Sequence, residues 1–250
     1  MRPERAFYDL QVRFARAAAR LTDMPLGAAL LDCTNLYVRF GAGRGFDAAH
    51  PLWEAYLSGI NRYASEAAQC EWTWRHVQRC QANETYRAGP AVVATFGCFS
   101  YAREPHGGLR LHFNAQADNG LSPLDIRRFD ARRDELRRLI DHLRAHLHES
   151  GDTSRDPLVH GTSWLYNLPA YRRLFPAVYV ASAQPVARLR ALSLWGQFLD
   201  RRGCVRKDSA AKLLAQAERE RDFARLVQCF PVQALAVHAP VSAFRADFTV

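Results

Sequence analysis

This chain of 250 residues contains little lysine and no C-x-x-C cysteine pair. Of its 34 basic residues only Lys207 and Lys212 are lysines, so arginine carries almost all of the positive charge. The six cysteines, at positions 33, 70, 80, 98, 204 and 229, include no C-x-x-C pair. So few cysteines at such spacings exclude a disulfide framework and are typical of reduced thiols.

Long apolar runs are absent as well. The opening residues, MRPERAFYDLQ, contain no apolar core of a signal peptide. No run approaches the roughly 18 apolar residues that a membrane-spanning helix needs. Hydrophobic residues make up 48% of the chain and charged residues 24%, which is ordinary for a globular protein. We therefore expect a cytoplasmic protein that does not insert into a membrane.

Several motifs of catalysis and ligand binding are also missing. The glycine-rich residues 41–45 neither follow a predicted strand nor continue into Gly-Lys-Ser/Thr, which excludes a dinucleotide fingerprint and a P-loop. Ser163 stands in H-G-T-S-W rather than G-x-S-x-G, so no nucleophile elbow is encoded. His142 and His146 are four residues apart, but no third ligand is specified nearby. We therefore predict no metal site.

The first part of the chain has helical periodicity. An apolar stripe that begins at Phe7 recurs at helical spacing, and Pro51 stands where the first turn of another helix is expected. Further helices are predicted after Pro25 and over residues 72–86. No repeat, low-complexity tract or long Gly/Ser linker interrupts the chain. These patterns predict a helical N-terminal subdomain, residues 1–88.

The periodicity changes at Gly89-Pro90. The β-branched and aromatic segment 91–102 and the segment 109–113 (LRLHF) flank a turn, which predicts a β-hairpin. Ser122-Pro123-Leu124-Asp125 then supplies an N-cap, a first-turn proline and an acid for a helix that reaches residue 149. The other predicted elements are strands at 158–166, 177–183, 192–200 and 235–239 and helices at 169–175 and 208–229.

This order of elements predicts an α+β (or α/β) protein. The helical N-terminal third should pack on a mixed sheet in a second subdomain, residues 89–250, with the order β-β-α-β-α-β. We expect the sheet to contain residues 91–114, 158–166 and 177–183. The helix at 123–149 should cover one of its faces.

Positive charge is concentrated in residues 171–212. This segment has nine basic and two acidic residues, so it carries seven of the nine net charges. A solvated basic face is the ordinary explanation, and an anion site is the functional one, because guanidinium groups bind phosphates bidentately. No recognition helix or stacking platform for nucleic acid is recognisable. As a functional segment it would bind a small phosphate-bearing molecule rather than nucleic acid.

The second half contains three motifs in order: the strand LRLHF, the helix opened by residues 121–125, and the strand with Ser163-Trp164-Leu165. Together they resemble the C-terminal domain of divergent GNAT-type acyltransferases. The likeness covers about residues 92–200 and implies a GNAT-like second half. It also implies an acyl-CoA-dependent N-acyltransferase that uses acetyl-CoA or another acyl-CoA and an unspecified amine. The Arg/Gln-x-x-Gly-x-Gly/Ala pyrophosphate loop of that family does not follow the strand.

The resemblance also implies roles for individual residues. Acyl-CoA would lie between splayed strands at 109–114 and 158–166. His160 or His112 would deprotonate the amine, and Tyr166 or Tyr171 would protonate the leaving thiolate. Ser163 would orient a carbonyl or a water. The candidates for binding the phosphates of the cofactor come from the basic segment: Arg172, Arg173, Arg201 and Arg202.

Two alternatives stay open at this point. His112 alternates with apolar residues and would face solvent in a purely structural role, while Tyr166 would then pack in the core. At the level of the whole chain, the alternative is a non-catalytic binding or scaffold protein whose basic surface meets an anionic partner. The missing pyrophosphate loop favours that alternative, and the three motifs favour the enzyme.

Overall fold

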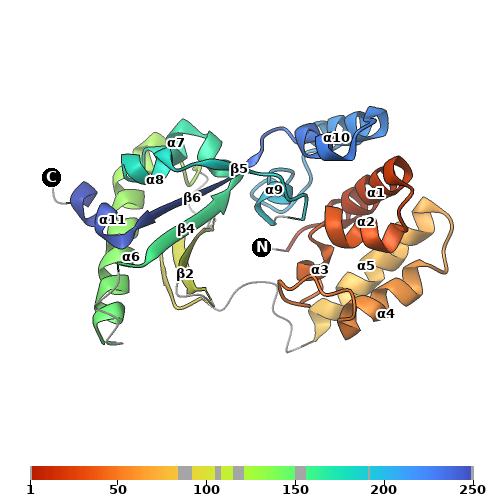
Figure 1. Cartoon of the computed structure of the whole chain (residues 1–250), viewed down its shortest axis with the longest axis horizontal. Coiled ribbons are helices and arrows are strands. Elements are labelled where there is room, and N and C mark those ends of the chain that lie inside the picture. Colours follow the sequence, from red (N-terminus) through yellow and green to blue (C-terminus); the bar gives the residue numbers. More distant parts are fainter. Residues whose placement is uncertain are drawn as a thin grey trace. The chain divides into compact units, whose positions relative to one another are not determined.

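The computed structural model describes residues 2–83, 92–104, 108–114, 121–149, 156–190 and 192–248, and it divides into two compact units. The first unit combines residues 1–90 with 187–233, and the second combines 91–186 with 234–250. Figure 1 shows helices in the first unit and a sheet with flanking helices in the second. The chain first passes from the first unit to the second between residues 90 and 91, next to the boundary predicted at residues 88–89. Residues 187–233, which the sequence placed in the second subdomain, belong to the first unit.

The first unit is built around α1, residues Arg5–Thr22. Phe7, Leu10 and Phe14 of its apolar stripe are buried, and α2, α5 and α10 pack on it. The helices predicted after Pro25 and at Pro51 are present. The described elements of this unit are α1, α2 (Leu26–Cys33), α3 (Leu36–Arg39), α4 (Pro51–Ile60), α5 (Glu66–Ala82), α9 (Leu192–Gly196), α10 (Lys207–Arg219) and the 3-10 helix η3 (Phe223–Cys229).

Three sequence predictions in this unit need correction or completion. The segment 192–200, predicted as a strand, begins with helix α9, because Leu194 and Trp195 are fully buried and the Trp195 ring packs edge-on against Phe14. The helix predicted at 208–229 ends at Arg219, and a separate 3-10 helix follows. The helix predicted over 72–86 lies within α5 up to Ala82, and its last three residues fall outside the described residues.

The second unit contains a mixed sheet of six strands, which confirms the predicted α+β fold. Neighbouring strands follow the order β1-β2-β3-β4-β6-β5. β3 and β4 are parallel, and the other neighbouring pairs are antiparallel. The strands are β1 (Ala94–Phe96), β2 (Phe99–Arg103), β3 (Leu109–Phe113), β4 (Leu158–Ser163), β5 (Gln184–Val186) and β6 (Ala234–Pro240).

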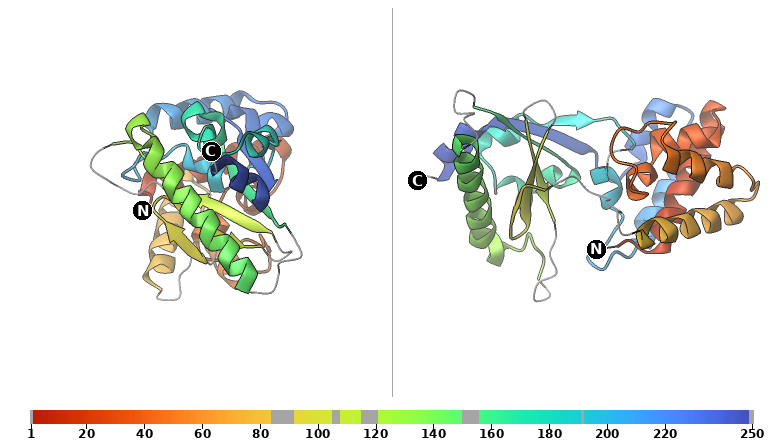
Figure 2. Two further views of the ribbon diagram at one scale, coloured as in Figure 1. Left: turned by 90° about the vertical axis from the view of Figure 1, so that its left-hand side faces the viewer. Right: turned by 90° about the horizontal axis from the view of Figure 1, so that it is seen from below.

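Helices cover one face of this sheet. α6 (Phe129–Glu149) connects β3 to the parallel β4 and lies along β1 and β2 in both views of Figure 2. Its residues Leu136 and Leu143 share a core with Val159 of the sheet. The other helical elements of the unit are η1 (Ile126–Arg128), η2 (Trp164–Asn167), α7 (Pro169–Arg172), α8 (Ala177–Ala181) and α11 (Val241–Phe248).

Most strands of this unit were predicted, but one was not. The strands at 158–166 and 235–239 are present, although 164–167 forms η2. The predicted hairpin is present as β2 with β3, but the segment 91–102, predicted as one strand, turns at Gly97 into the antiparallel strands β1 and β2. The strand predicted at 177–183 is wrong, because those residues begin with helix α8. Pro176 precedes its first turn, Val178 is 56% exposed and Tyr179 is buried. The neighbouring segment Gln184–Val186 joins the sheet instead, beside β6.

The helix predicted from residue 123 begins in two steps. The side chain of Asp125 accepts a hydrogen bond from the Arg127 amide (3.0 Å) and caps the 3-10 turn η1. The α-helical part then starts at Phe129 and continues to Glu149, as predicted. Among the described residues, no helix has both the length and the apolar character needed to cross a membrane.

Close packing in the first unit predicts the effect of adding one methyl group. A Cβ at Gly59 would overlap the indole of Trp72, which is held in place by a hydrogen bond from its Nε1 to the Tyr56 carbonyl (3.0 Å). Gly59→Ala should therefore lower the free energy of unfolding by about 1–3 kcal/mol in urea. Gly45→Ala is the control, because nothing lies within 4 Å of a Cβ there. Equal stabilities of the two variants would contradict this packing.

Candidate functional site

The parallel strands β3 and β4 pair over a short length. Their register contains two residue pairs, Leu109 with Val159 and Arg110 with His160. Both strands continue for three more residues, to Phe113 and Ser163, without pairing with each other. The facing edges of these strands therefore carry backbone groups that the pair itself does not hydrogen-bond. We call this stretch beyond the last β3–β4 pair the splay; the resemblance implied a gap between these two strands.

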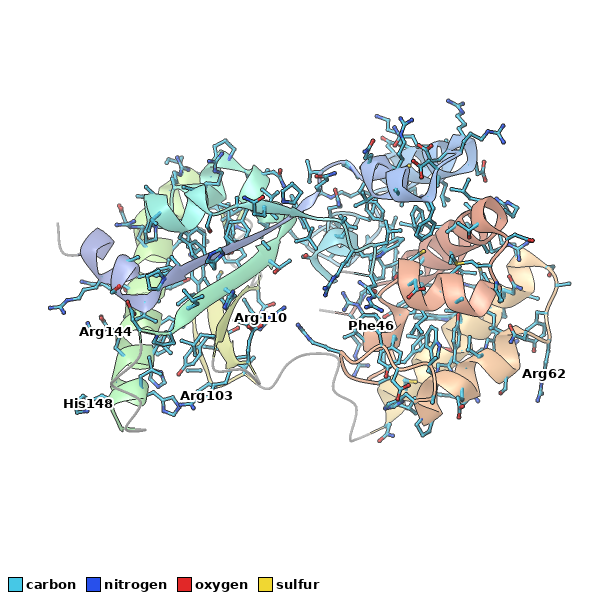
Figure 3. The ribbon with its side chains drawn as sticks, in the orientation of Figure 1. Phe46, Arg62, Arg103, Arg110, Arg144 and His148 are labelled. Atoms are coloured by element: carbon cyan, nitrogen blue, oxygen red, sulfur yellow. The ribbon has the colours of Figure 1, made fainter. Side chains whose placement is uncertain are left out.

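The polar face of the sheet carries the two candidate bases. Residues in register on neighbouring strands point to the same face, so Arg110 of β3, His160 of β4 and His238 of β6 form one row. His112, two residues after Arg110, lies on this same face beyond the last β3–β4 pair. Arg110 extends from the sheet on the side away from α6 (Figure 3). His160 and His112 are both partly exposed.

An ion pair flanks His160 on this face. The Arg110 guanidinium donates to the Glu104 carboxylate (Nε to Oε1, 2.6 Å) across the β2–β3 turn. Gly108 lies next to both His160 and Glu104, since a Cβ there would lie 3.0 Å from the His160 ring and 3.2 Å from the Glu104 carboxylate. The ring centroids of His160 and His238 are 6.1 Å apart. The sequence analysis missed this arrangement, because it depends on the register of three strands.

The two candidate acids lie on the opposite, helix-covered face. Tyr166 and Tyr171 are 3% and 2% exposed, and their rings are 5.0 Å apart. The Tyr166 hydroxyl is 2.9 Å from that of Tyr179, a residue without a predicted role. Burial raises the pKa of both Tyr166 and Tyr171 well above the ordinary value. The Tyr179 phenol raises the pKa of Tyr166 further, and Tyr166 does the same for Tyr171. Both hydroxyls therefore hold their protons at neutral pH.

Ser163 serves the backbone in this structure. Its hydroxyl oxygen accepts a hydrogen bond from the Leu165 amide (3.1 Å) and caps the 3-10 helix η2 at the end of β4. The serine is partly exposed. Ser163 is the last residue of β4, which agrees with the prediction that this segment forms a strand end. The cap gives its hydroxyl a structural role.

The four candidate arginines are divided between the two units. Arg172 and Arg173 stand exposed at the end of α7 in the second unit, and the Arg173 guanidinium lies 5.3 Å from the ring centroid of Phe129, the first residue of α6. Arg201 and Arg202 belong to the first unit, in a turn where the Asp200 side chain accepts from the Arg202 and Cys204 amides. The basic segment is therefore not one structural element.

A buried ion pair fixes the end of β3, and the sequence analysis missed it. Arg132 and Glu135 of α6 are each 8% exposed, and their side chains are 2.7 Å apart. The Glu135 carboxylate accepts from the Cys98 amide (3.0 Å), and Cys98 in turn accepts the Asn114 amide through its carbonyl. Arg132 also donates to the Cys98 sulfur. The helix thus holds the β1–β2 turn and the chain directly after β3.

Gly97 makes room for this carboxylate. Its φ of +57° is in the left-handed region, and a Cβ would overlap the Glu135 carboxylate. The glycine and the i, i+3 pair on α6 were the available sequence signals.

Within the part of the chain that the structure describes, no group of three or more His, Cys, Asp or Glu side chains could hold a metal ion.

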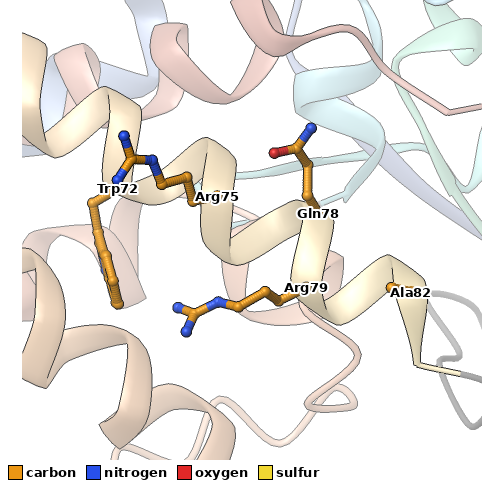
Figure 4. Close-up of a pocket in the computed structure, with 5 residues that line it drawn as sticks. All are labelled: Trp72, Arg75, Gln78, Arg79 and Ala82. Atoms are coloured by element: carbon orange, nitrogen blue, oxygen red, sulfur yellow. The ribbon is translucent and has the colours of Figure 1, made fainter.

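The first unit has a shallow hollow along α5, shown in Figure 4 and lined by Trp72, Arg75, Gln78, Arg79 and Ala82. Its charged side chains already have partners. Arg79 lies over the Trp72 ring at 4.8 Å, and Arg75 donates to Glu71 (2.8 Å). Both arginine side chains of the hollow therefore already interact with other side chains of the protein. None of the candidate site residues lines the hollow.

The comparisons with known proteins supply no family for this chain. None of the family models, curated proteins or solved structures compared with it matches. The assignment of the site therefore depends on its geometry and on the resemblance of its motifs.

His76 predicts how the first unit responds to pH. It is 5% exposed between Phe40 and Tyr56, and its Nε2 is buried without a hydrogen-bond partner. Burial, assisted by the Arg79 charge, lowers its pKa to about 4. Because the unfolded chain binds a proton below its ordinary pKa near 6.5 and the folded chain does not, stability is lost as pH falls from about 6.5 toward 4.

We expect this loss to reach about 2 kcal/mol between pH 7 and pH 5, measured by urea unfolding of the first unit. The variant His76→Phe keeps an aromatic ring and removes the titrating group, so its stability should depend less on pH by that amount. Identical pH profiles for the variant and the wild type would show that His76 is not the group responsible.

Proposed function

We propose that this chain is an acyl-CoA-dependent N-acyltransferase of the GNAT type. The observation that carries the proposal is the splay between β3 and β4, with histidines on one face of the sheet and buried tyrosine hydroxyls on the other. The three motifs that resemble GNAT-type enzymes fall on β3, on the start of α6 and on β4 with η2. The acyl donor is acetyl-CoA or a related thioester, and the acceptor is an amine.

The splay suits a thioester with amide groups along its chain. Residues 111–113 of β3 and 161–163 of β4 follow the last β3–β4 pair, so the ladder between these two strands does not use the amides and carbonyls on their facing edges. A ligand placed there gains main-chain hydrogen bonds, and amides aimed at the thioester carbonyl stabilise the negative charge that develops on its oxygen. This fits the group that the resemblance implies.

In the proposed mechanism the amine loses its proton on one face of the sheet, and the sulfur receives a proton on the other face. His112, beyond the last β3–β4 pair, and His160, in the last pair, are placed to take the proton of an amine that arrives over the polar face. Tyr166 and Tyr171, kept protonated by burial, are placed to give a proton to the sulfur on the helix-covered face. The splay is where groups from both faces of the sheet reach one substrate.

Arginines of the second unit supply charge for the phosphates. Arg173 packs over Phe129 at the start of α6, and Arg172 stands next to it. In the proposed complex these side chains take the place of the glycine-rich pyrophosphate loop that the family has at this point. Arg201 and Arg202 lie in the other unit and have no assigned part in this step.

Calorimetric titration with coenzyme A and acetyl-CoA tests the proposal directly. We expect saturable binding that weakens modestly as salt rises, because a few phosphate contacts are involved. Replacing both Arg172 and Arg173 by glutamine should weaken binding about tenfold or more. Replacing Arg137 and Arg138 on the exposed side of α6 removes the same charge within the same unit and should leave binding unchanged.

The result also separates the two hypotheses for the whole chain. No heat of binding up to millimolar concentrations of either compound would reject the enzyme and favour the non-catalytic scaffold. If the two double substitutions weaken binding equally, the protein still binds coenzyme A, but Arg172 and Arg173 have no specific part in that binding. The corresponding Arg201→Gln, Arg202→Gln variant tests whether the first unit contributes.

A further inference from the structure

We propose that the hollow along α5 binds a small organic carboxylate, with Arg79 and Arg75 on the carboxylate and the apolar body of the molecule beside Trp72. The hollow lies in the first unit, whereas the proposed acyl transfer uses groups of the second unit. The inference therefore goes beyond the proposed function and does not depend on it. The sequence analysis predicted no site in this part of the chain.

The arginines of the hollow carry more positive charge than the nearby acids offset. α5 contains two acids: Glu66 forms ion pairs with arginines of α1, and Glu71 is shared between Arg5 and Arg75. Among the described residues, no carboxylate pairs with Arg79. Arg75 and Arg79 are one helical turn apart, and like charges at this spacing repel each other. An anion between the two arginines would offset that repulsion.

Two neutral side chains hold the Arg79 guanidinium in place. Its central carbon lies 4.8 Å from the centroid of the Trp72 ring, and its Nη2 is 3.4 Å from His76 Nδ1. Stacking on an indole uses the face of a guanidinium, so the N–H groups in its plane remain available as hydrogen-bond donors. A guanidinium has five such donors, and His76 accepts from at most one of them. Arg79 is therefore already ordered as a planar fork for a carboxylate, and binding costs little side-chain entropy.

Trp72 is a firm support for this fork. Its Nε1 donates to the Tyr56 carbonyl (3.0 Å), a Cβ at Gly59 would overlap the indole, and the Tyr63 ring lies 6.3 Å from it. Residues 56–63 thus contact the ring while Arg79 lies over it. A nucleobase would need an open aromatic face on which to stack. The arrangement instead favours a compact apolar group next to the guanidinium.

The lining of the hollow suits such a group. Its volume is about 490 Å³, which lies in the range of small-molecule sites. Figure 4 shows Arg75 and Arg79 extending from α5 toward the side on which Trp72 lies. Trp72, Ala82 and the aliphatic stems of the two arginines supply apolar surface, and Gln78 completes the lining. A free inorganic anion would leave this apolar surface unused, so the lining favours a carboxylate attached to an apolar body.

Nuclear magnetic resonance titration of the whole chain tests this site. The probe is 3-phenylpropanoate, which combines a carboxylate with a compact apolar group. Acetate supplies the charge alone, and 3-phenylpropanamide supplies the apolar group alone. The indole N–H signal of Trp72 is the local reporter, because this N–H bonds to the Tyr56 carbonyl beside the hollow. Trp74, whose ring packs near Tyr8, lies on the same helix and is the reporter that should not move.

We expect 3-phenylpropanoate to shift the Trp72 signal saturably, with dissociation constants about tenfold or more higher for acetate and for the amide. Arg79→Gln should weaken binding of the acid about tenfold or more, because hydrogen bonds between ions are lost. Arg79→Lys keeps the charge without the planar fork, so it should lose most of the affinity as well. Arg219→Gln is the matched control, since Arg219 is also an exposed arginine in the last turn of a helix of this unit, α10, and is outside the hollow.

Contrary results would overturn the inference in different ways. If acetate or the amide binds as tightly as the acid, the hollow does not recognise a carboxylate on an apolar body. If Arg79→Lys binds the acid like the wild type, the site responds to charge alone. Equal effects of Arg79→Gln and Arg219→Gln, or no shift of Trp72 at millimolar concentrations of the acid, would show that Arg79 does not bind it. Coenzyme A binding is measured separately, so this inference and the proposed function can fail independently.

Discussion

Backbone hydrogen bonding between β3 and β4 ends after Arg110 and His160, and the candidate site depends on that limit. A parallel pair that continued to Phe113 and Ser163 would satisfy its own amides and close the sheet there. Two restraints act near the place where the strands separate. The Arg132–Glu135 pair on α6 holds the turn before β2 and the chain after β3. On the other strand, η2 turns the chain away directly after β4.

The separation brings two chemical environments to one place. The polar face of the sheet carries ionisable side chains in a row across three strands, and water reaches them because they are partly exposed. The opposite face carries phenols in an aromatic core that keeps them neutral. Burial thus favours the neutral form of the tyrosines, whereas the histidines on the other face are partly exposed.

Local signals in the sequence explain what was predicted well. The cap signal at 122–125 and the alternation around 109–113 are short-range patterns. The strand at 109–113 appears where it was expected, and the helix ends where it was expected but starts later, at Phe129, after a 3-10 turn capped by Asp125. The segments 177–183 and 192–200 failed for a shared reason. Both are apolar runs without clear periodicity, and tertiary burial of Tyr179 and Trp195 selected helices over strands. Composition also gave no sign that 187–233 joins the N-terminal helices, so the basic segment was treated as one unit.

The position of β6 affects how this protein can fold. β6 follows the other described strands in the chain, yet it lies inside the sheet, between β4 and β5. β5 pairs with no other described strand, so it stays unpaired until residues 234–240 arrive. Between β5 and β6 the chain first completes part of the helical unit, residues 187–233. Closing the sheet is therefore a long-range event that waits on a distant segment, which slows folding relative to a hairpin-built sheet and exposes a bare strand edge in the meantime.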